Sequence, residues 1–231
     1  MDRAEVRPRP HADDLVGMRG PVVDYLSRKR GLDVLAACIL LILFGPIMLL
    51  IALGIKLHSP GPILYRQKRI GKDGVPFDML KFRSMRDGAP SAPHREHVQR
   101  LMRENIRPRD LGSATLKLRN DSRITGLGRI LRGLSLDELP QFLNVLRGEM
   151  SLVGPRPPLP YEYELYTDWA KQRLRVPPGI TGLWQVTGRN QVSFEEMVRI
   201  DLAYIRQMNA LLDLSIVART PFEMLRGKGG G

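Results

Sequence analysis

Two adjacent acidic residues, Asp137 and Glu138, lie in the segment GLSLDELPQ at positions 133–141. A carboxylate can act as a nucleophile, bind a magnesium ion or transfer a proton. The same segment also fits an S-x-x-E capping box, in which Ser135 caps a helix and Glu138 reaches back to the backbone N–H of Ser135. Pro140 argues against this cap, because proline prefers the first position of a helix and would start the helix after both acids. Taken alone, the segment favours the cap and leaves the catalytic interpretation open.

Basic residues on both sides of these acids could bind an anionic substrate. The guanidinium fork of arginine suits the oxygens of a diphosphate, because it can donate two parallel hydrogen bonds. Arg156 lies within the segment GPRPP at 154–158, a stiff loop that could hold its guanidinium in place. For most of these residues taken singly, a solvated surface charge is the simpler interpretation. The candidates are Arg129, Arg132, Arg147, Arg156, Lys81, Arg83 and Arg189.

The charge of the whole chain indicates anionic partners. Of 231 residues, 36 are Lys or Arg and 24 are Asp or Glu, which gives a net charge of +12. A surplus of this size favours binding to phosphate-rich molecules or to anionic lipids. Only 6% of the residues are aromatic, and no basic stretch alternates with aromatic residues that could stack on bases. We therefore expect no nucleic-acid partner.

Cysteine and histidine offer little chemistry in this chain. Cys38 is the only cysteine and lies in an apolar run, which excludes a disulfide or a cysteine-based zinc site within one chain. His94 and His97 have the spacing of one helical face, but two histidines without nearby partners are more often part of a solvated surface. We expect cytosolic chemistry and no metal site at these histidines.

The longest apolar segment, residues 34–55, contains no charged residue and could enter a membrane. As a helix it would be about 33 Å long, enough for one crossing. Gly45 and Pro46 lie in its middle, where a sharp kink or a turn is accessible. Basic residues flank both ends, so a re-entrant hairpin keeps both flanks cytoplasmic, whereas a spanning helix keeps one. A bend in hydrocarbon requires partners for its backbone groups, and the residues alone leave both arrangements open.

The remaining segments predict one catalytic domain between two tails. Residues 1–27 and 226–231 lack a periodic apolar pattern, which is typical of disordered tails. Residues 63–85 alternate around a KDG turn, which predicts a short β-hairpin. Residues 211–225 are amphipathic and could pack on the core or lie in the headgroup layer. We expect an α-rich α+β fold, with the catalytic domain over residues 59–225.

Several motifs together resemble those of the bacterial sugar transferase family, the monotopic phosphoglycosyl transferases that initiate lipid-linked glycan assembly. The resemblance extends from residue 28 to about residue 220, in the family's order. The segment 86–119 resembles members that transfer a simple hexose phosphate, and it does not separate glucose from galactose. The motifs are KRGLD at 29–33, SPGPILYRQKRIG at 59–71, KFRSM at 81–85, NDSRIT at 120–125, SLDELPQFLNVLRGEMSLVGPRP at 135–157 and PGITGLWQVTGR at 178–189.

The resemblance implies a re-entrant membrane helix over residues 28–58, broken at Gly45 and Pro46. A small cytosolic catalytic domain with interfacial amphipathic helices would follow it, on the cytoplasmic face of the bacterial inner membrane. The family commonly has a Ser-Pro pair at the break. Here Gly45 replaces the serine, so any hydrogen bond of a serine hydroxyl at the bend is lost. The resemblance favours the hairpin over the spanning helix.

The resemblance also implies that Asp137 and Glu138 form a catalytic dyad, against the capping interpretation. Asp137 would attack the phosphorus attached to the sugar of a UDP-sugar, expel UMP and form an aspartyl phosphosugar. Polyprenyl phosphate, such as undecaprenyl phosphate, would then take the sugar phosphate. Glu138 would position groups or handle protons, and Mg2+ bound by both acids would neutralise the diphosphate. The residues expected to bind substrate phosphates are Arg132, Arg156, Lys81, Arg83 and Arg189.

The expected partners are a UDP-sugar donor, a polyprenyl phosphate acceptor and membrane lipids, with downstream glycosyltransferases as further partners in glycan assembly. One alternative is direct transfer in a ternary complex, in which the acids only bind Mg2+. It predicts no exchange of UMP in the absence of lipid. A second alternative is a membrane-anchored basic module that binds anions without catalysis.

Overall fold

The protein is described by a computed structural model that covers residues 21–85, 92–107, 110, 123–188 and 191–226. Helices predominate in these residues, and two small two-stranded sheets accompany them. The expected α-rich α+β fold is confirmed. The helices and strands are α1 (Pro21–His58), β1 (Leu64–Ile70), η2 (Lys72–Gly74), β2 (Pro76–Phe82), α2 (Ala92–Arg103), α3 (Gly126–Gly133), η4 (Leu136–Glu138), α4 (Gln141–Arg147), β3 (Ser151–Val153), α5 (Pro160–Tyr163), α6 (Asp168–Lys171), η5 (Gln172–Arg175), β4 (Gly179–Thr181), α7 (Leu183–Thr187), α8 (Phe194–Gln207) and α9 (Ala210–Arg226).

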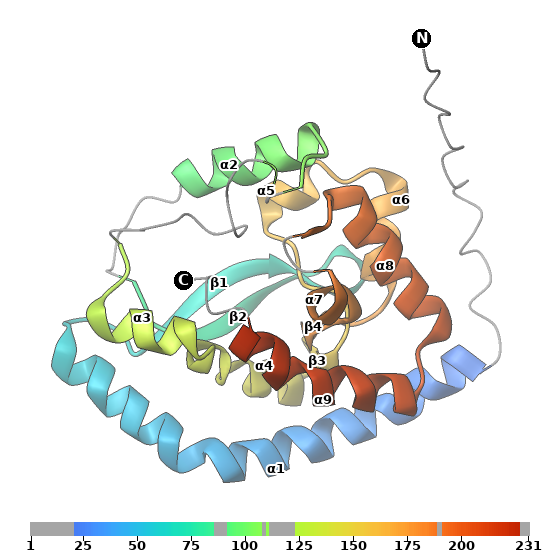
Figure 1. The fold of residues 1–231 in the computed structure, drawn as a ribbon. Helices are drawn as coiled ribbons and strands as arrows, with labels where there is room; N and C mark the ends of the chain where they lie inside the picture. The colour runs from blue at the N-terminus through green and yellow to red at the C-terminus, as the bar shows by residue number, and fades with distance from the viewer. Residues whose placement is uncertain (1–20, 86–91, 108–109, 111–122, 189–190, 227–231) are drawn as a thin grey trace.

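The long helix α1 lies along one side of the domain, as Figure 1 shows. The β1–β2 hairpin crosses the middle, and α2 and α5 lie on the side away from α1. The segment α3–η4–α4 follows α1 on the near side of the hairpin, and α8 and α9 close the domain at the other end. The acids Asp137 and Glu138, in η4, therefore lie between the hairpin and the long helix.

α1 is a single helix of 38 residues that continues through Gly45 and Pro46. It begins at Pro21, so residues 21–27, expected to belong to a tail, form its first turns, where proline is well tolerated. The rest of the predicted tail, residues 1–20, lies outside the described residues. Figure 1 shows α1 bent, with its concave side toward the domain, as expected where a proline removes a helical hydrogen bond. A bend in a continuous helix thus replaces the predicted break.

One face of α1 packs on the domain, while the other is apolar and exposed. Ala37, Ile51 and Ile55 are buried against the rest of the chain. By length and composition, α1 is the helix among the described residues that could cross a membrane, and it supports a membrane association of the chain. The large exposed apolar residues of α1 are Leu32, Leu35, Ile39, Ile42, Leu43, Ile47, Leu49, Leu50, Leu53 and Leu57.

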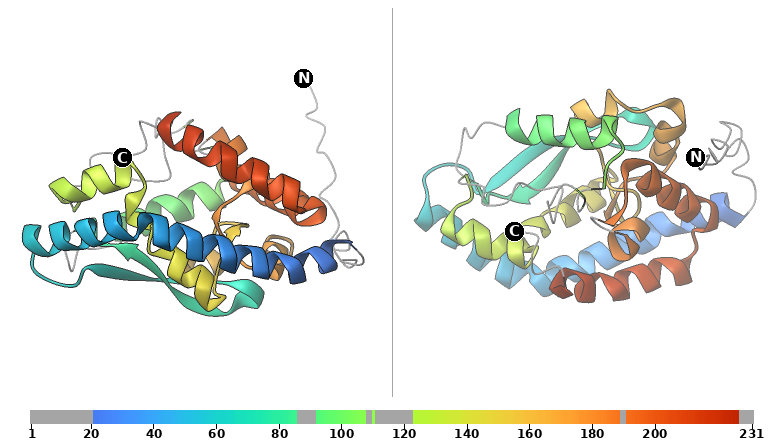
Figure 2. Two further views of the ribbon diagram at one scale, coloured as in Figure 1. Left: turned by 90° about the horizontal axis from the view of Figure 1, so that it is seen from below. Right: turned by 45° about the horizontal axis from the view of Figure 1, so that its top comes forward.

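Polar contacts join the beginning of α1 to α9, which lies beside it in Figure 2. Lys29, 5% exposed, forms an ion pair with Asp213 of α9, and Tyr25 donates a 2.7 Å hydrogen bond to the same carboxylate. The carboxylate of Asp33 accepts a 3.1 Å hydrogen bond from the backbone N–H of Leu152 in β3. These contacts use both charged ends of the KRGLD motif, and they fix α1 to the catalytic domain.

The hairpin confirms the prediction made for residues 63–85. β1 and β2 are antiparallel, and the KDG turn between them has positive φ values of 55° at Asp73 and 81° at Gly74. The register pairs Tyr65 with Lys81 and Arg69 with Phe77. Directly paired residues point to the same face of a sheet, so Lys81 and Arg69 share one face of the hairpin.

The second sheet is a short parallel pair, β3 and β4, that supports the GPRPP loop. Gly154 follows β3, and a Cβ atom added to Gly179 would lie 2.1 Å from the backbone nitrogen of Gly154. The two backbones therefore approach each other more closely than any other residue would allow. This contact fixes the start of the loop that carries Arg156.

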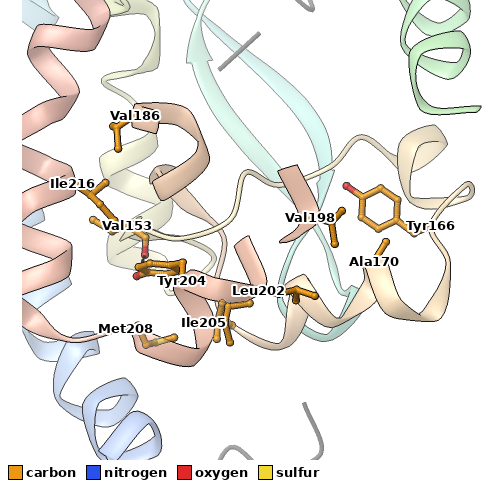
Figure 3. Packing of buried hydrophobic residues seen from close by; sticks show 11 residues of the cluster. Val153, Tyr166, Ala170, Val186, Val198, Leu202, Tyr204, Ile205, Met208 and Ile216 are labelled. Atoms are coloured by element: carbon orange, nitrogen blue, oxygen red, sulfur yellow. Dashed lines mark hydrogen bonds between the residues drawn. The ribbon is translucent and has the colours of Figure 1, made fainter. Parts of the chain in front are cut away.

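The main core cluster surrounds α8 and joins it to α6, α7, α9 and β3, as Figure 3 shows. The hydroxyl of Tyr204 lies 2.7 Å from Asp213 Oδ1 and 3.2 Å from the carbonyl oxygen of Val153, so this core also contacts the polar cluster at the start of α1. The buried members are Val153, Tyr166, Ala170, Val176, Val186, Val198, Leu202, Tyr204, Ile205, Met208 and Ile216.

Candidate active site

The acids Asp137 and Glu138 lie in the one-turn helix η4, between α3 and α4. Ser135 precedes η4 in a left-handed conformation, with φ of 54°, and its side chain makes no capping hydrogen bond. Pro140 is the N-cap of α4, so α4 begins after both acids. The capping interpretation of the segment is therefore wrong.

The two acids differ in burial. Asp137 is 7% exposed, whereas Glu138 is half-buried. The Nζ atom of Lys81, on β2, lies 2.8 Å from Glu138 Oε1. Lys81, expected to bind a substrate phosphate, thus contacts Glu138, one member of the acid pair, and the hairpin supplies a cation next to this carboxylate.

α4 is held from two sides, which fixes the segment that carries the acids. The fully buried side chain of Asn144 accepts a 2.9 Å hydrogen bond from the N–H of Leu80 and donates a 2.8 Å bond to the carbonyl of Asp78. Asn144 thus satisfies the free edge of β2 in the way a neighbouring strand would. From the other side, Arg30 of α1 donates a 2.9 Å hydrogen bond to the carbonyl of Leu146, at the end of α4. The long helix α1 and the β1–β2 hairpin therefore both position α4.

Arg132 lies in the last turn of α3, which packs against η4. Its Nε atom is buried and has no hydrogen-bond partner among the described residues. A buried guanidinium nitrogen without a partner is costly, because it has lost its hydration without replacement. This geometry makes Arg132 a good candidate to donate to a bound anion.

Arg83 is placed differently from the prediction. It is 6% exposed, and its guanidinium donates 2.8 Å hydrogen bonds to the carbonyls of Ser59 and Pro60. These donors hold the turn that follows α1 against β2. Because its donors are already engaged with backbone carbonyls, Arg83 is better explained as a structural residue than as a phosphate-binding one.

Arg156 belongs to a cluster of charges with Arg69 and Glu162, which we call the Glu162 cluster. The Oε2 atom of Glu162 lies 3.4 Å from Arg156 Nη1 and 4.0 Å from Arg69 Nη1. Arg69 and Glu162 are both 5% exposed, whereas the side chain of Arg156 is 29% exposed. The cluster contains two cations and one anion, so its exposed member is a guanidinium available to an anionic ligand.

The pKa values show how these charges act on one another. Burial lowers the pKa of Arg69 to about 10, and the charge of Arg156 adds to this, while the carboxylates of Glu162 and Glu138 oppose it. Burial raises the pKa of Glu162, but the charges of Arg156 and Arg69 and a hydrogen bond from Leu159 outweigh it, so the pKa falls below its ordinary value. Arg69 therefore interacts electrostatically with both Arg156 and Glu138.

The remaining predicted site residues are Arg189, Gly45 and Pro46. Arg189 lies outside the described residues. Gly45 and Pro46 lie within α1. The structure therefore brings Asp137, Glu138 and Lys81 together, with Arg132 on the adjoining helix and Arg156 linked through Arg69.

Three contributors were not predicted from the sequence: Arg69, Asn144 and Glu162. For Arg69 a signal existed, because the KDG turn fixes the register that puts Arg69 and Lys81 on one face. No comparable signal identifies Asn144 or Glu162. Their partners depend on how α4 and α5 pack on the hairpin.

Comparison with known proteins shows the family of the chain. The family model for bacterial sugar transferases matches residues 24–227, and the chain belongs to this family. It is accordingly an enzyme of the phosphoglycosyl transferase class.

Several curated relatives have names that state a related activity. The exopolysaccharide production protein ExoY of Rhizobium meliloti is 46% identical over 192 residues, which cover 83% of each chain. The UDP-glucose:undecaprenyl-phosphate glucose-1-phosphate transferase of Caulobacter vibrioides is 44% identical and covers 84% of this chain and 68% of its own. The undecaprenyl-phosphate galactose phosphotransferase of Salmonella typhimurium is 38% identical over 87% of this chain and 41% of its own.

Proposed function

We propose that the protein transfers a sugar-1-phosphate from a UDP-sugar to undecaprenyl phosphate, giving undecaprenyl-diphosphate-sugar and UMP. The observation that carries the proposal is the buried Asp137 beside Glu138, with Lys81 at 2.8 Å from Glu138 and Arg132 on the adjoining helix. Relatives named for transfer of glucose-1-phosphate and galactose phosphate to undecaprenyl phosphate support it. The family to which the chain belongs rules out a module without catalysis.

In the proposed mechanism, a carboxylate oxygen of Asp137 attacks the phosphorus attached to the sugar. The bond from this phosphorus to the bridging oxygen breaks, and UMP leaves with that oxygen. A phosphate oxygen of the polyprenyl phosphate then attacks the same phosphorus and releases the carboxylate of Asp137. Glu138, held by Lys81, positions the attacking groups and handles protons. Because a carboxylate is a modest nucleophile, positioning and charge neutralisation supply most of the acceleration.

The proposed diphosphate contacts come from Arg132, Arg156 and Arg189. Arg132 offers a buried Nε atom without a partner among the described residues, and Arg156 offers a partly exposed guanidinium. The two adjacent carboxylates, Asp137 and Glu138, fit the preference of Mg2+ for one or two protein carboxylates together with phosphate oxygens and water. When bound, Mg2+ would supply neutralisation of the diphosphate charge.

We further propose that α1 enters the inner membrane from the cytoplasmic side and returns to it. The bend of α1, its exposed apolar face and the basic residues at both ends support this arrangement. The site would then lie at the level of the lipid headgroups, where a polyprenyl phosphate presents its charged end. The reaction would be the first membrane step of a polysaccharide pathway, and downstream glycosyltransferases would use its product.

The decisive experiment is the exchange of labelled UMP into UDP-sugar in the absence of lipid. A covalent route lets the wild-type enzyme catalyse this exchange, because the first step is complete without an acceptor. We expect Asp137→Asn to abolish both exchange and turnover, whereas Glu138→Gln retains some exchange. Asp73→Asn, in the exposed KDG turn, serves as the matched control and should behave as the wild type.

Two outcomes separate this route from its alternative. Robust exchange by Asp137→Asn would exclude Asp137 as the nucleophile. Turnover with lipid but no exchange without it, in the wild-type enzyme, would instead favour direct transfer in a ternary complex. Screening UDP-sugars for UMP release in the same preparation identifies the donor.

A further inference from the structure

The three members of the Glu162 cluster are held to different degrees. Arg69 is fixed by all three of its guanidinium nitrogens. Its Nη1 atom donates a 2.9 Å hydrogen bond to the carbonyl of Pro157, and its Nε and Nη2 atoms donate to Gln67 Oε1 at 3.2 Å and 2.8 Å. The buried Arg69 therefore has a defined place on the face of β1.

Glu162 is also fixed. Its Oε2 atom accepts a 2.7 Å hydrogen bond from the backbone N–H of Leu159, which anchors the carboxylate to the end of the GPRPP loop. The side chain is 6% exposed, so water screens its charge only weakly. The negative charge is thus held at a set position between two guanidinium groups.

Arg156 is the least constrained of the three. Within the described part of the chain, its guanidinium has one ion pair and one hydrogen bond, both from Nη1 to Glu162 Oε2 at 3.4 Å. Beside it lies a cavity of about 50 Å³ whose lining includes Arg156, Glu162, Tyr166 and Trp184. Packing on that side therefore leaves room for the guanidinium to move. The position of the Arg156 guanidinium is therefore set by its ion pair with Glu162 and not by close packing.

Arg69 adds a repulsive force to this arrangement. Arg156 contributes to the lowering of the pKa of Arg69, whereas Glu162 opposes it, as expected when an anion separates two cations. If the charge of Glu162 were removed, the side chain of Arg69 could not move away from Arg156, because its donors are engaged with Gln67 and Pro157. Arg156 would move instead, away from Arg69.

We propose that Glu162 is a positioning residue for the donor, acting through Arg156. It holds the guanidinium of Arg156 at the place where the diphosphate of the nucleotide sugar binds. Because the fixed Arg69 repels Arg156, this position of Arg156 depends on the negative charge of Glu162. The inference rests on the proposed function, in which Arg156 binds the donor diphosphate. Glu162 itself touches neither the donor nor the reacting atoms.

The test uses the full chain with three substitutions. Glu162→Gln keeps the side-chain shape and an acceptor for the N–H of Leu159 but removes the charge. Glu162→Asp keeps the charge but draws it back by one methylene. Glu164→Gln is the matched control, because Glu164 is two residues away and exposed, with only a 3.9 Å contact to Arg95.

We expect Glu162→Gln to raise KM for the UDP-sugar about tenfold, the scale for losing one charged hydrogen bond. We expect kcat to change less than KM, because the acids and Lys81 are untouched. KM should rise by a smaller factor in Glu162→Asp and stay unchanged in Glu164→Gln. The affinity for UMP, measured by calorimetry, should fall in parallel with the rise in KM for the donor.

A double-mutant cycle with Arg156→Met distinguishes positioning from a general structural role. If Glu162 acts through Arg156, then Glu162→Gln adds no further increase in KM to Arg156→Met. The double variant also lacks the repulsion between two arginines, so it remains informative should Glu162→Gln alone fail to fold. A wild-type KM in Glu162→Gln, or the same increase in both backgrounds, overturns the inference. These outcomes differ from a failure of the proposed function. If that function were wrong, the wild-type enzyme would release no UMP from any UDP-sugar in the presence of polyprenyl phosphate.

Discussion

Two buried arginine–carboxylate clusters lie in this domain, and they differ in charge balance and in access. The Glu162 cluster has two arginines for one carboxylate, and Arg156 remains partly exposed. The second, which we call the Asp201 cluster, consists of Arg173, Asp201 and the hydroxyl of Tyr166. Arg173 and Asp201 form an ion pair, both are 1% exposed, and Arg173 donates a 2.7 Å hydrogen bond to Tyr166.

The carboxyl pKa values of the two clusters shift in opposite directions, although both groups are buried. Burial raises the pKa of Asp201 to about 6, because one guanidinium only partly compensates for lost hydration. Burial also acts on Glu162, but two guanidinium groups and a backbone N–H reverse its effect, so the pKa of Glu162 falls below 4.5. The number of donors around each carboxylate decides the sign.

The difference distinguishes a structural ion pair from one that serves a ligand. In the Asp201 cluster, Arg173 of η5 and Asp201 of α8 neutralise each other inside the core, and Arg173 Nε and Asp201 Oδ1 have no further partners among the described residues. In the Glu162 cluster, the side chain of the unbalanced cation, Arg156, is partly exposed. A surplus guanidinium at a partly exposed position favours an anionic ligand.

The largest expected effect is on folding stability, from Arg173→Met. Removing the cation of this buried pair leaves the carboxylate of Asp201 without its compensating charge, which costs about 3 to 5 kcal/mol in the free energy of unfolding. We expect this loss in denaturant unfolding of the purified protein, with KM for the donor unchanged in the folded fraction. Asp168→Asn, whose exposed carboxylate pairs with Lys171, should leave the stability nearly unchanged. Equal stability of the two variants would contradict the structural role of the Asp201 cluster.

The next effect is kinetic, from Arg156→Met. Loss of the surplus guanidinium should lower kcat/KM for the UDP-sugar about a hundredfold, as for removal of one partner of a charge-assisted contact. Stability should change little, because Glu162 keeps Arg69 as its partner. Steady-state kinetics and thermal unfolding, compared with the exposed Arg95→Met variant, check both expectations. A loss of stability comparable to that of Arg173→Met would remove the distinction between the clusters.

The smallest effect is the pH dependence of stability, which should have opposite signs for the two carboxylates. The lowered pKa of Glu162 means that its contribution is fully present above pH 4.5 and is lost as the pH falls through the folded-state pKa. The pKa of Asp201 rises from 3.8 to about 6, so folding disfavours its ionised form and stability decreases as the pH rises between these values. The free energy of unfolding of the wild type, Glu162→Gln and Asp201→Asn should be measured from pH 3.5 to 7. Subtracting the value of each variant from that of the wild type gives the pH dependence that each carboxylate contributes. Slopes of the same sign would be incompatible with the two environments.

Local sequence was sufficient where neighbouring residues decide the outcome. The alternation around KDG predicted the β1–β2 hairpin, because a tight turn with positive φ at Gly74 fixes the pairing of the strands that it connects. The uncharged segment 34–55 predicted the apolar part of α1, which its composition alone requires. The motifs around Asp137 were specific enough to indicate the family that the comparisons later showed.

Two S-x-x-E segments show where local sequence stops being sufficient. At Ser193, the capping box forms, and Glu196 accepts a 2.7 Å hydrogen bond from the N–H of Ser193. At Ser135, the same pattern produces no side-chain cap, and Lys81, 57 residues from Glu138 in the chain, contacts the glutamate instead. The four-residue pattern is identical, but Pro140 starts α4 after the acids and Lys81 of β2 pairs with Glu138, so the pattern alone does not decide the outcome.

The sequence by itself therefore determined the elements, the acids and the anion-binding character of the chain. Tertiary structure alone decided which partner each charge has. It assigned Arg83 to the carbonyls of Ser59 and Pro60, and it brought Arg69 into contact with its acceptor Pro157, which is 88 residues away in the sequence. The physical reason is that a charge satisfies its hydrogen bonds with the groups that the fold brings near, and long-range packing sets those groups.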